Sequence, residues 1–163
     1  LTGEMFVEYV KIDTRNRKKI NSFIAKQWFS TDMVIRGTII DMTRVDGIVA
    51  LEKENIVGLL TYLIREKSCE ITSLDSLVEG KGIGTSLINK AISIAKESDC
   101  KKIIVVTTND NINAIRFYQK RGFDMVCFYH NALDISRKMK PSIPLLGDNG
   151  IPLKHEIEFE INL

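Results

Sequence analysis

The segment from Glu79 to Gly84 is the part of the sequence best suited to binding a charged ligand. It reads Glu-Gly-Lys-Gly-Ile-Gly and lies between a predicted strand and a predicted helix. Gly82 and Gly84 let the backbone curl and place no side chain between a ligand and the backbone amides. Unpaired N–H groups at a helix N-terminus, with the helix dipole behind them, favour phosphate binding. The alternative is a tight turn that needs glycine for its own geometry.

Two common phosphate-binding motifs do not fit this segment. A Walker A loop has Ser or Thr after its Gly-Lys pair, whereas Gly80-Lys81 is followed by Gly82. The dinucleotide fingerprint spaces its glycines as G-x-G-x-x-G after a parallel strand, whereas the spacing here is G-x-G-x-G after predicted antiparallel strands. The segment therefore indicates an anion site of another kind.

A second segment, residues 111–123, follows the helix and strand after the glycines. It contains Asn111, then Ala114 and Tyr118 one helical turn apart, then Gly122-Phe123 leading into a strand. In this order the two segments resemble the GNAT superfamily of N-acetyltransferases. The family's helix signature is an Asn, then Ala-x-x-x-Tyr, then Gly-Phe.

The glycine segment corresponds to the family's Q/R-x-x-G-x-G/A motif. Glu79, Gly82 and Gly84 occupy its three positions, so a Glu stands where the family usually has Gln or Arg. The resemblance covers residues 47–129 and implies a GNAT-like acyl-CoA transferase fold. The strand before the glycines and the strand near Ile103 are then expected to splay apart.

The resemblance implies transfer of the acetyl group of acetyl-CoA directly to a primary amine, with no metal. The pyrophosphate would lie on the glycine-loop amides, and the pantetheine arm would run along residues 74–78. The cofactor-binding residues that it implies are Leu74, Leu77, Val78, Gly80, Lys81, Gly82, Ile83, Gly84, Thr85, Asn111, Ala114 and Tyr118.

Two catalytic roles follow from the resemblance. Tyr118 occupies the position of the tyrosine that protonates the departing thiolate. The amine must lose a proton before it attacks, so a general base is also needed. Glu70 is the expected base by family position, and Asp75, near the splay, is the alternative. The non-catalytic alternative for each residue is a solvated or salt-bridged carboxylate.

Other residues that could do chemistry have structural interpretations that we favour. His130 and His155 flank strands, and the basic run at residues 15–19 is typical of a solvated helix face. Helical spacing favours a place in the core for three aromatic residues, Phe23, Trp28 and Phe29. Three carboxylates alternate on the last predicted strand, where they could attract a cationic amine or simply form an exposed strand face: Glu156, Glu158 and Glu160.

The elements that position these residues follow from hydrophobic periodicity. Helices are predicted over 14–29, 83–98 and 112–120, and a short helix over 132–139. Strands are predicted over 48–51, 56–64, 69–74, 103–107, 123–129 and 156–161, and residues 30–45 read as irregular. The first three strands form an antiparallel meander, and strand-helix-strand crossovers follow. The fold class is therefore mixed α/β, with a largely antiparallel central sheet of about six to seven strands and flanking helices.

Composition supports one ordinary globular domain over residues 1–163, with residues 1–4 expected to be a remnant ahead of Met5. The chain has 44% hydrophobic and 27% charged residues and a net charge of +2, which argues against a nucleic-acid partner. Cys69, Cys100 and Cys127 lack metal-ligand spacing and are expected as free thiols, the first and last in apolar runs. No apolar run is long enough to span a membrane, and no signal peptide is visible. We therefore expect a cytoplasmic protein.

The sequence leaves the acceptor open between a small-molecule amine and an amine of a peptide or protein. Monomer and homodimer are both compatible with it. The alternative function is a non-catalytic acyl-CoA-binding or regulatory module on the same fold, which turnover in the presence of amines would separate from an enzyme. A transferase that uses a longer acyl group is a further alternative.

Overall fold

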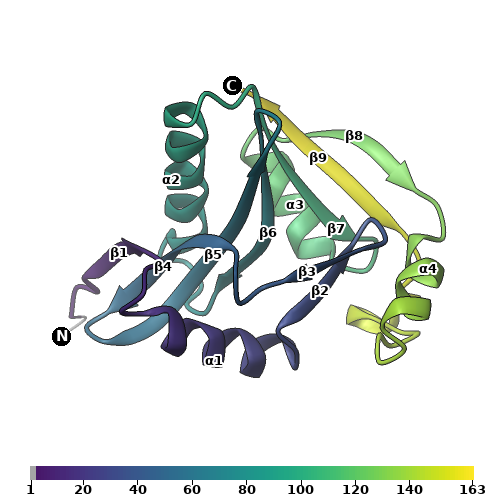
Figure 1. Ribbon diagram of the computed structural model, residues 1–163, viewed down its shortest axis with the longest axis horizontal. Coiled ribbons are helices and arrows are strands. Elements are labelled where there is room, and N and C mark those ends of the chain that lie inside the picture. Colours follow the sequence, from purple (N-terminus) through teal and green to yellow (C-terminus); the bar gives the residue numbers. More distant parts are fainter. Residues whose placement is uncertain (1–2) are drawn as a thin grey trace.

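A computed structural model describes residues 3–163. A seven-stranded sheet runs through the molecule in the order β1-β4-β5-β6-β7-β9-β8, and β2 and β3 form a separate two-stranded sheet (Figure 1). The strands are β1 (Val7–Lys11), β2 (Asp32–Ile35), β3 (Thr38–Asp41), β4 (Asp46–Glu52), β5 (Asn55–Arg65), β6 (Ser68–Ser76), β7 (Lys102–Thr108), β8 (Asp124–Tyr129) and β9 (Glu156–Asn162). The expected α/β class with a largely antiparallel sheet is confirmed.

Helices cover both faces of the central sheet. They are α1 (Arg17–Trp28), α2 (Ile83–Glu97), α3 (Ile112–Lys120) and α4 (Ala132–Met139), with a short 3₁₀ turn, η1 (Asp148–Gly150). The buried stripe of α2, including Leu87 and Ile88, packs with Tyr118 of α3 and Phe159 of β9 in the larger core. On the other face, α1 and the β2–β3 hairpin form a second core.

The gap between β6 and β7 is the feature of the sheet that matters for function. These strands pair in parallel only from Ser68 with Lys102 to Ile71 with Val105. A bulge follows at once, because Thr61 of β5 faces Ser73 whereas Tyr62 faces Ile71. Bulges bend a strand and end its pairing on one side. Beyond the bulge the two strands diverge (Figure 1).

Hydroxyl groups stabilise this bulge from within the sheet. The Thr61 Oγ1 lies 2.7 Å from the Thr72 Oγ1 and 2.6 Å from the Ser73 Oγ, and all three residues are buried. Each buried hydroxyl therefore has a partner although the strand is irregular there. The splay that was expected between these strands is thus built into the local sequence.

The N-terminal part of the chain departs from the sequence prediction. β1, which pairs antiparallel with β4, was not predicted. The prediction of irregular chain over residues 30–45 was wrong, because β2 and β3 form a regular hairpin with a turn at Arg36-Gly37. Helix α1 begins at Arg17, after the predicted Thr14. These elements are short, and their apolar residues show little periodicity.

Two other expectations concern parts of the chain away from the sheet gap. Cys69 and Cys100 are buried, but Cys127 is exposed on the edge strand β8 despite the apolar run of sequence in which it lies. Of the expected remnant at residues 1–4, residues 1 and 2 lie outside the described residues. No helix within residues 3–163 combines the length and apolarity that a membrane crossing requires.

Candidate active site

Two hollows open on the gap between β6 and β7. The first, of about 580 Å³, is formed by the end of β6, the glycine loop and α3, and we call it the glycine-loop hollow. The second, of about 610 Å³, is formed by the end of α1, β2, the end of β7, α4 and the loop after it, and we call it the Glu156 hollow. Asn111, at the start of α3, lines both. A group in one hollow can therefore approach a group in the other at this point.

The glycine loop presents backbone amides to the first hollow. Gly80 and Gly82 have φ angles of +70° and +69°, a region that side chains other than glycine rarely adopt, and a Cβ atom at either would meet open space. Gly82 is the N-cap of α2. The first intrahelical bond of α2 runs from the Ser86 N–H to the Gly82 carbonyl, so the three amides before Ser86 have no partner within the helix.

Gly84 is needed for a different reason. A Cβ atom there would lie 3.1 Å from the Phe117 Cζ, tighter than ordinary van der Waals contact. The glycine thus lets α2 approach α3 closely. The glycines thus serve different structural needs, since Gly80 and Gly82 adopt the positive φ angles of a turn and Gly84 lies in the helix contact, and the anion site at the amides stays a prediction.

Two arginines for which the sequence predicted no role add positive charge to this hollow. Arg116 and Arg121 both line it. The Arg121 guanidinium lies 3.6 Å from the centroid of the Phe117 ring and donates a hydrogen bond of 2.9 Å to the Thr85 Oγ1. An arginine held by a ring and a hydroxyl is preorganised for phosphate oxygens. The signal was present in residues 111–123, since both arginines lie within that segment.

Most of the predicted cofactor-binding residues come together in the glycine-loop hollow. Leu77 and Lys81 do not line it, and Leu77 is instead tied to β5 through its N–H, which donates to the Val57 carbonyl at 2.9 Å. The predicted residues that do line it are Leu74, Val78, Gly80, Gly82, Ile83, Gly84, Thr85, Asn111, Ala114 and Tyr118. The Asn111 side chain also caps α3 by accepting a hydrogen bond from the Ala114 N–H at 3.1 Å.

Tyr118 is buried at the inner end of the same hollow. Its ring packs edge-on against Phe117 and Phe123, with centroids 5.5 and 5.4 Å away, and obliquely against Phe159. Burial raises the pKa of its phenol, and the nearby Asp75 carboxylate adds to that rise. The hydroxyl is therefore neutral at physiological pH. The bland alternative, a hydroxyl in solvent at a helix end, does not fit a residue that is only 6% exposed.

Asp75 lies on β6 beyond the bulge, between Leu74 and Ser76 of the glycine-loop hollow, although it lines neither hollow itself. It is buried, and the Trp28 indole N–H donates a hydrogen bond of 3.1 Å to its Oδ2. Desolvation raises the pKa of this carboxyl to about 6, against smaller opposing effects of hydrogen bonds from Trp28 and Gln27. Such a carboxyl is a better proton acceptor near neutral pH than an ordinary aspartate.

Glu70 has a different environment. It lies on the part of β6 that is still paired with β7, before the gap. The Arg36 guanidinium, from the β2–β3 turn, lies 2.8 Å from its Oε1 in an ion pair. Glu70 lines neither hollow. Its interpretation as a salt-bridged carboxylate is thus confirmed, and its role as a base stays a prediction.

The three glutamates of β9 do not form an exposed strand face, so that expectation was wrong. Glu156 is only 2% exposed and lines the second hollow. Glu158 lies 3.4 Å from the Arg36 guanidinium and accepts a hydrogen bond of 2.5 Å from the Tyr129 hydroxyl. Glu160 pairs with Lys102 at 2.8 Å. Sheet order explains the error, because β9 lies between β7 and β8 and is not an edge strand.

Two aromatic residues expected in the core lie at the Glu156 hollow instead. Trp28 is 43% exposed and Phe29 is 94% exposed, and both line the hollow, because α1 ends there and leaves its last turn uncovered. Phe23, one turn earlier, packs against the second core as expected. Helical spacing alone does not show where a helix passes the edge of its core.

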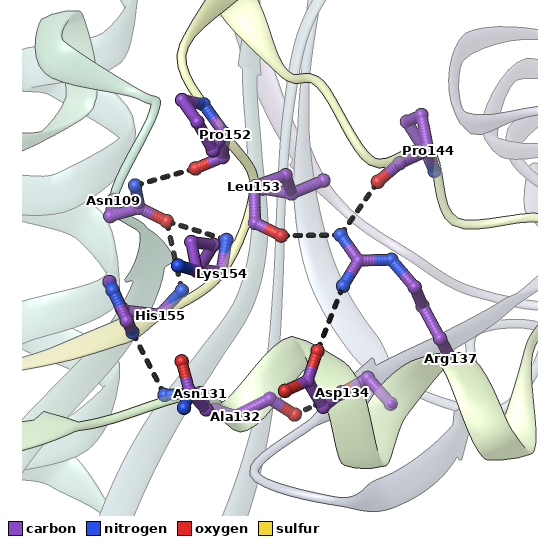
Figure 2. Close-up of polar contacts among 11 residues, drawn as sticks. Asn109, Asn131, Ala132, Asp134, Arg137, Pro144, Pro152, Leu153, Lys154 and His155 are labelled. Atoms are coloured by element: carbon purple, nitrogen blue, oxygen red, sulfur yellow. Dashed lines mark hydrogen bonds and ion pairs between the residues drawn. The ribbon is translucent and has the colours of Figure 1, made fainter.

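Hydrogen bonds hold the far wall of the Glu156 hollow in place (Figure 2). Asn109, just after β7, donates to the Pro152 carbonyl and accepts from the N–H groups of Lys154 and His155, each at 2.9 Å. Arg137 of α4 donates to the carbonyls of Pro144 and Leu153. The loop after α4, in which η1 is the one short helical turn among the described residues, is thus tied both to the end of β7 and to α4.

His130 and His155 line neither hollow. The two imidazoles of His130 and His155 stack with centroids 4.9 Å apart. The His155 Nδ1 accepts a hydrogen bond of 2.8 Å from the Asn131 N–H. These contacts agree with the structural roles that were expected for both. No group of three or more His, Cys, Asp or Glu residues within 3–163 is arranged to hold a metal ion.

Comparison with known proteins agrees with this geometry. Residues 15–123 match the acetyltransferase (GNAT) family. The uncharacterised protein YxbD of Bacillus subtilis (strain 168) is 48% identical over 139 residues, which cover 85% of this chain and 87% of that protein. The chain therefore belongs to the GNAT family and is an acetyl-CoA-dependent acetyltransferase.

Solved structures show the same fold at low sequence identity. An IAA acetyltransferase from Bacillus cereus ATCC 14579 has a TM-score of 0.74 and 22% identity, covering 97% of this chain and all of that one. A GNAT family acetyltransferase from Elizabethkingia anophelis with acetyl-CoA bound has a TM-score of 0.69 and 18% identity, covering 96% of this chain and 98% of that one. The fold resemblance thus extends beyond residues 47–129 to almost the whole chain.

Proposed function

We propose that the protein transfers the acetyl group of acetyl-CoA directly to a primary amine at the gap between β6 and β7. One observation carries the proposal: the glycine loop with its free amides, the two arginines and Tyr118 line a single hollow that opens on this gap. The amides and arginines would hold the pyrophosphate. The free edge of β6 beyond the bulge would pair with the pantetheine arm.

In the proposed transfer step, each of these groups has one role. The amine nitrogen attacks the thioester carbonyl carbon, a C–N bond forms, and the C–S bond breaks. A backbone N–H at the free edge of β6 stabilises the oxyanion. The Tyr118 hydroxyl gives its proton to the departing CoA thiolate and is later reprotonated from water. The proton that the amine loses goes to a base.

Asp75 is our proposal for that base, with a water molecule carrying the proton. It lies beyond the bulge, it acts electrostatically on Tyr118, and burial raises its pKa to about 6. Glu70, the base expected by family position, is held by Arg36 away from the gap. The Arg36 guanidinium lies 2.8 Å from its Oε1, so this carboxylate is already engaged in an ion pair.

Binding and turnover are the tests. Acetyl-CoA and CoA should both raise the melting temperature, because both carry the pyrophosphate and bind the folded state. Free thiol should then appear from acetyl-CoA when an acceptor amine is added. Binding without thiol release across a broad amine panel would contradict the proposed enzyme and favour the alternative, a non-catalytic acyl-CoA-binding module.

A further inference from the structure

The walls of the Glu156 hollow are mainly apolar. Aromatic and aliphatic side chains from α1, β2, β7, α4 and the following loop form them: Trp28, Phe29, Met33, Val34, Ile35, Val106, Leu133, Ile143, Pro144 and Leu153. Apolar walls of this extent bind an apolar body by removing it from water. A small, strongly hydrated acceptor would leave most of this surface unused.

Two acidic side chains interrupt the apolar lining, and only one has an oxygen to spare. Asp110 uses both oxygens, since Oδ1 accepts from the Thr108 hydroxyl at 2.5 Å and Oδ2 from the Asp148 N–H at 2.9 Å. Glu156 accepts a single hydrogen bond, from the Arg36 N–H to Oε2 at 3.0 Å. Within residues 3–163 no other hydrogen bond to this carboxylate is present, and the residue is only 2% exposed.

The surrounding charges leave Glu156 in need of a cation. Two carboxylates, those of Glu70 and Glu158, share one guanidinium, that of Arg36. Glu156 receives only a hydrogen bond from the Arg36 backbone N–H. Lys140 also lines the hollow and keeps its positive charge, but its ammonium donates to the neutral Asp32 carbonyl at 2.7 Å and makes no ion pair with Glu156. Buried carboxylates are stable when a cation or hydrogen bonds complete their environment.

We infer that the acceptor is a primary amine on a hydrophobic alkyl or arylalkyl body, and that Glu156 binds its ammonium group in the Glu156 hollow. The inference rests on the proposed function and names the substrate class of that site. Glu156 lies opposite Thr108 on the strand next to β7, so an amine bound there is one strand away from the gap. Anionic acceptors would be repelled, and polar acceptors would not fill the walls.

The test compares amines that differ in the body that carries the nitrogen. Hexylamine and 2-phenylethylamine are compared with ethanolamine, spermidine and a short peptide with a free N-terminus, by release of free thiol from acetyl-CoA. The hydrophobic amines should have kcat/KM values at least about 10-fold above those of the polar amines, because each buried methylene contributes on the order of a fewfold in affinity.

Glu156→Gln tests the ammonium contact. The glutamine can still accept the Arg36 N–H bond, so the change removes charge and keeps shape. The KM for 2-phenylethylamine should rise about 10- to 100-fold, as expected for losing a charged hydrogen bond. Inhibition by 2-phenylethanol, which has the same body without the charge, should be unchanged, as should acetyl-CoA affinity. Glu160→Gln is the matched control, on the same strand and outside the hollow, and should leave every constant unchanged.

The outcomes separate the inference from the proposed function. Turnover confined to ethanolamine, spermidine or the peptide would overturn the substrate class and leave the acetyltransferase intact. An unchanged KM for 2-phenylethylamine in Glu156→Gln would overturn the role of Glu156. Absence of turnover with every amine, with acetyl-CoA still bound, would overturn the proposed function and this inference with it.

Discussion

The two hollows meet at one gap in the sheet, yet the chemical groups that line them differ. The glycine-loop hollow is built from backbone amides, two arginines and a tyrosine on two stretches of chain, residues 74–85 and 111–121. The Glu156 hollow is built from apolar side chains of α1, β2, β7, α4 and the loop after it, and from a buried carboxylate of β9. The first suits a ligand with fixed charges, and the second suits a cation on a hydrophobic body. Changes in one hollow should therefore alter one substrate and spare the other.

Tyr118→Phe should produce the largest effect. The change keeps the ring packing against Phe117, Phe123 and Phe159 and removes only the hydroxyl. We expect kcat to fall about 10- to 1000-fold, near the range for a proton-transfer group. The melting temperature and the acetyl-CoA dissociation constant should barely move, because neither depends on the proton.

Tyr62→Phe is the control for this change, since it removes the hydroxyl of another buried tyrosine in the same core. It should retain the kcat of the unchanged protein. A Tyr118→Phe enzyme with full kcat, measured with a good acceptor and with chemistry rate-limiting, would remove the tyrosine from the mechanism.

Gly82→Val should confine its effect to the first hollow. The side chain would stand in the open space in front of the α2 amides, at a φ of +69°. The acetyl-CoA dissociation constant should rise at least about 10-fold, as expected when charge-assisted hydrogen bonds to phosphate are lost. Isothermal titration with CoA measures it, without any need for the acceptor.

Gly150→Val controls for backbone strain, because Gly150 has the same φ of +69°, also with open space around its Cβ position, and lines neither hollow. It should destabilise the fold to a similar degree and still bind CoA. If Gly82→Val and Gly150→Val bind CoA equally well, the loop glycines serve only the geometry of the turn. Gly84→Val is a poorer test, since its side chain would collide with Phe117 whatever the ligand does.

The contrast between the hollows also explains what the sequence could predict. The glycine loop and the Asn111–Tyr118 helix are continuous segments in which spacing fixes geometry, so most of the residues predicted there line the hollow, although Arg116 and Arg121 were not foreseen. The Glu156 hollow depends on where α1 ends, on the β2–β3 hairpin and on β9 lying inside the sheet. Each of these features depends on tertiary packing, which local sequence does not show. From the sequence, Trp28 was therefore expected in the core and Glu156 on an exposed strand face, although both line the hollow.

Asp75→Asn should separate catalysis from stability. The folded state raises the pKa of this carboxyl from 3.8 to about 6. Protonation is therefore favoured by folding, and the stability that it gives is present below pH 3.8 and lost as the pH rises through about 6. Above that pH the variant should be more stable than the unchanged protein, by at most about 3 kcal/mol for two pKa units.

Activity should move the other way. A base must be deprotonated, so kcat/KM of the unchanged protein should rise with pH through about 6, and Asp75→Asn should lose that limb and about 10- to 100-fold in rate. Glu70→Gln, which removes the carboxylate paired with Arg36, should keep the limb. If Glu70→Gln loses it and Asp75→Asn keeps it, the base is Glu70, as the family position implies.

Glu79→Gln should have the smallest effect of these changes, and it tests whether charge in the glycine-loop hollow affects acetyl-CoA binding. Glu79 is exposed, lines the glycine-loop hollow, and stands where the family usually has Gln or Arg. A carboxylate there repels the pyrophosphate through water, and such exposed charge interactions contribute about 0.2 to 1 kcal/mol. The acetyl-CoA dissociation constant should therefore fall about 1.5- to 5-fold at low salt, and the gain should shrink as salt screens the repulsion. Glu97→Gln, at the opposite end of α2, is the control and should leave the constant unchanged at every salt concentration.

The same variant tests whether the two hollows are independent. Because Glu156 acts on the other substrate, Glu79→Gln should leave the KM for the acceptor unchanged. A change in that KM of the same size as the change in the acetyl-CoA dissociation constant would show that the two hollows are not independent.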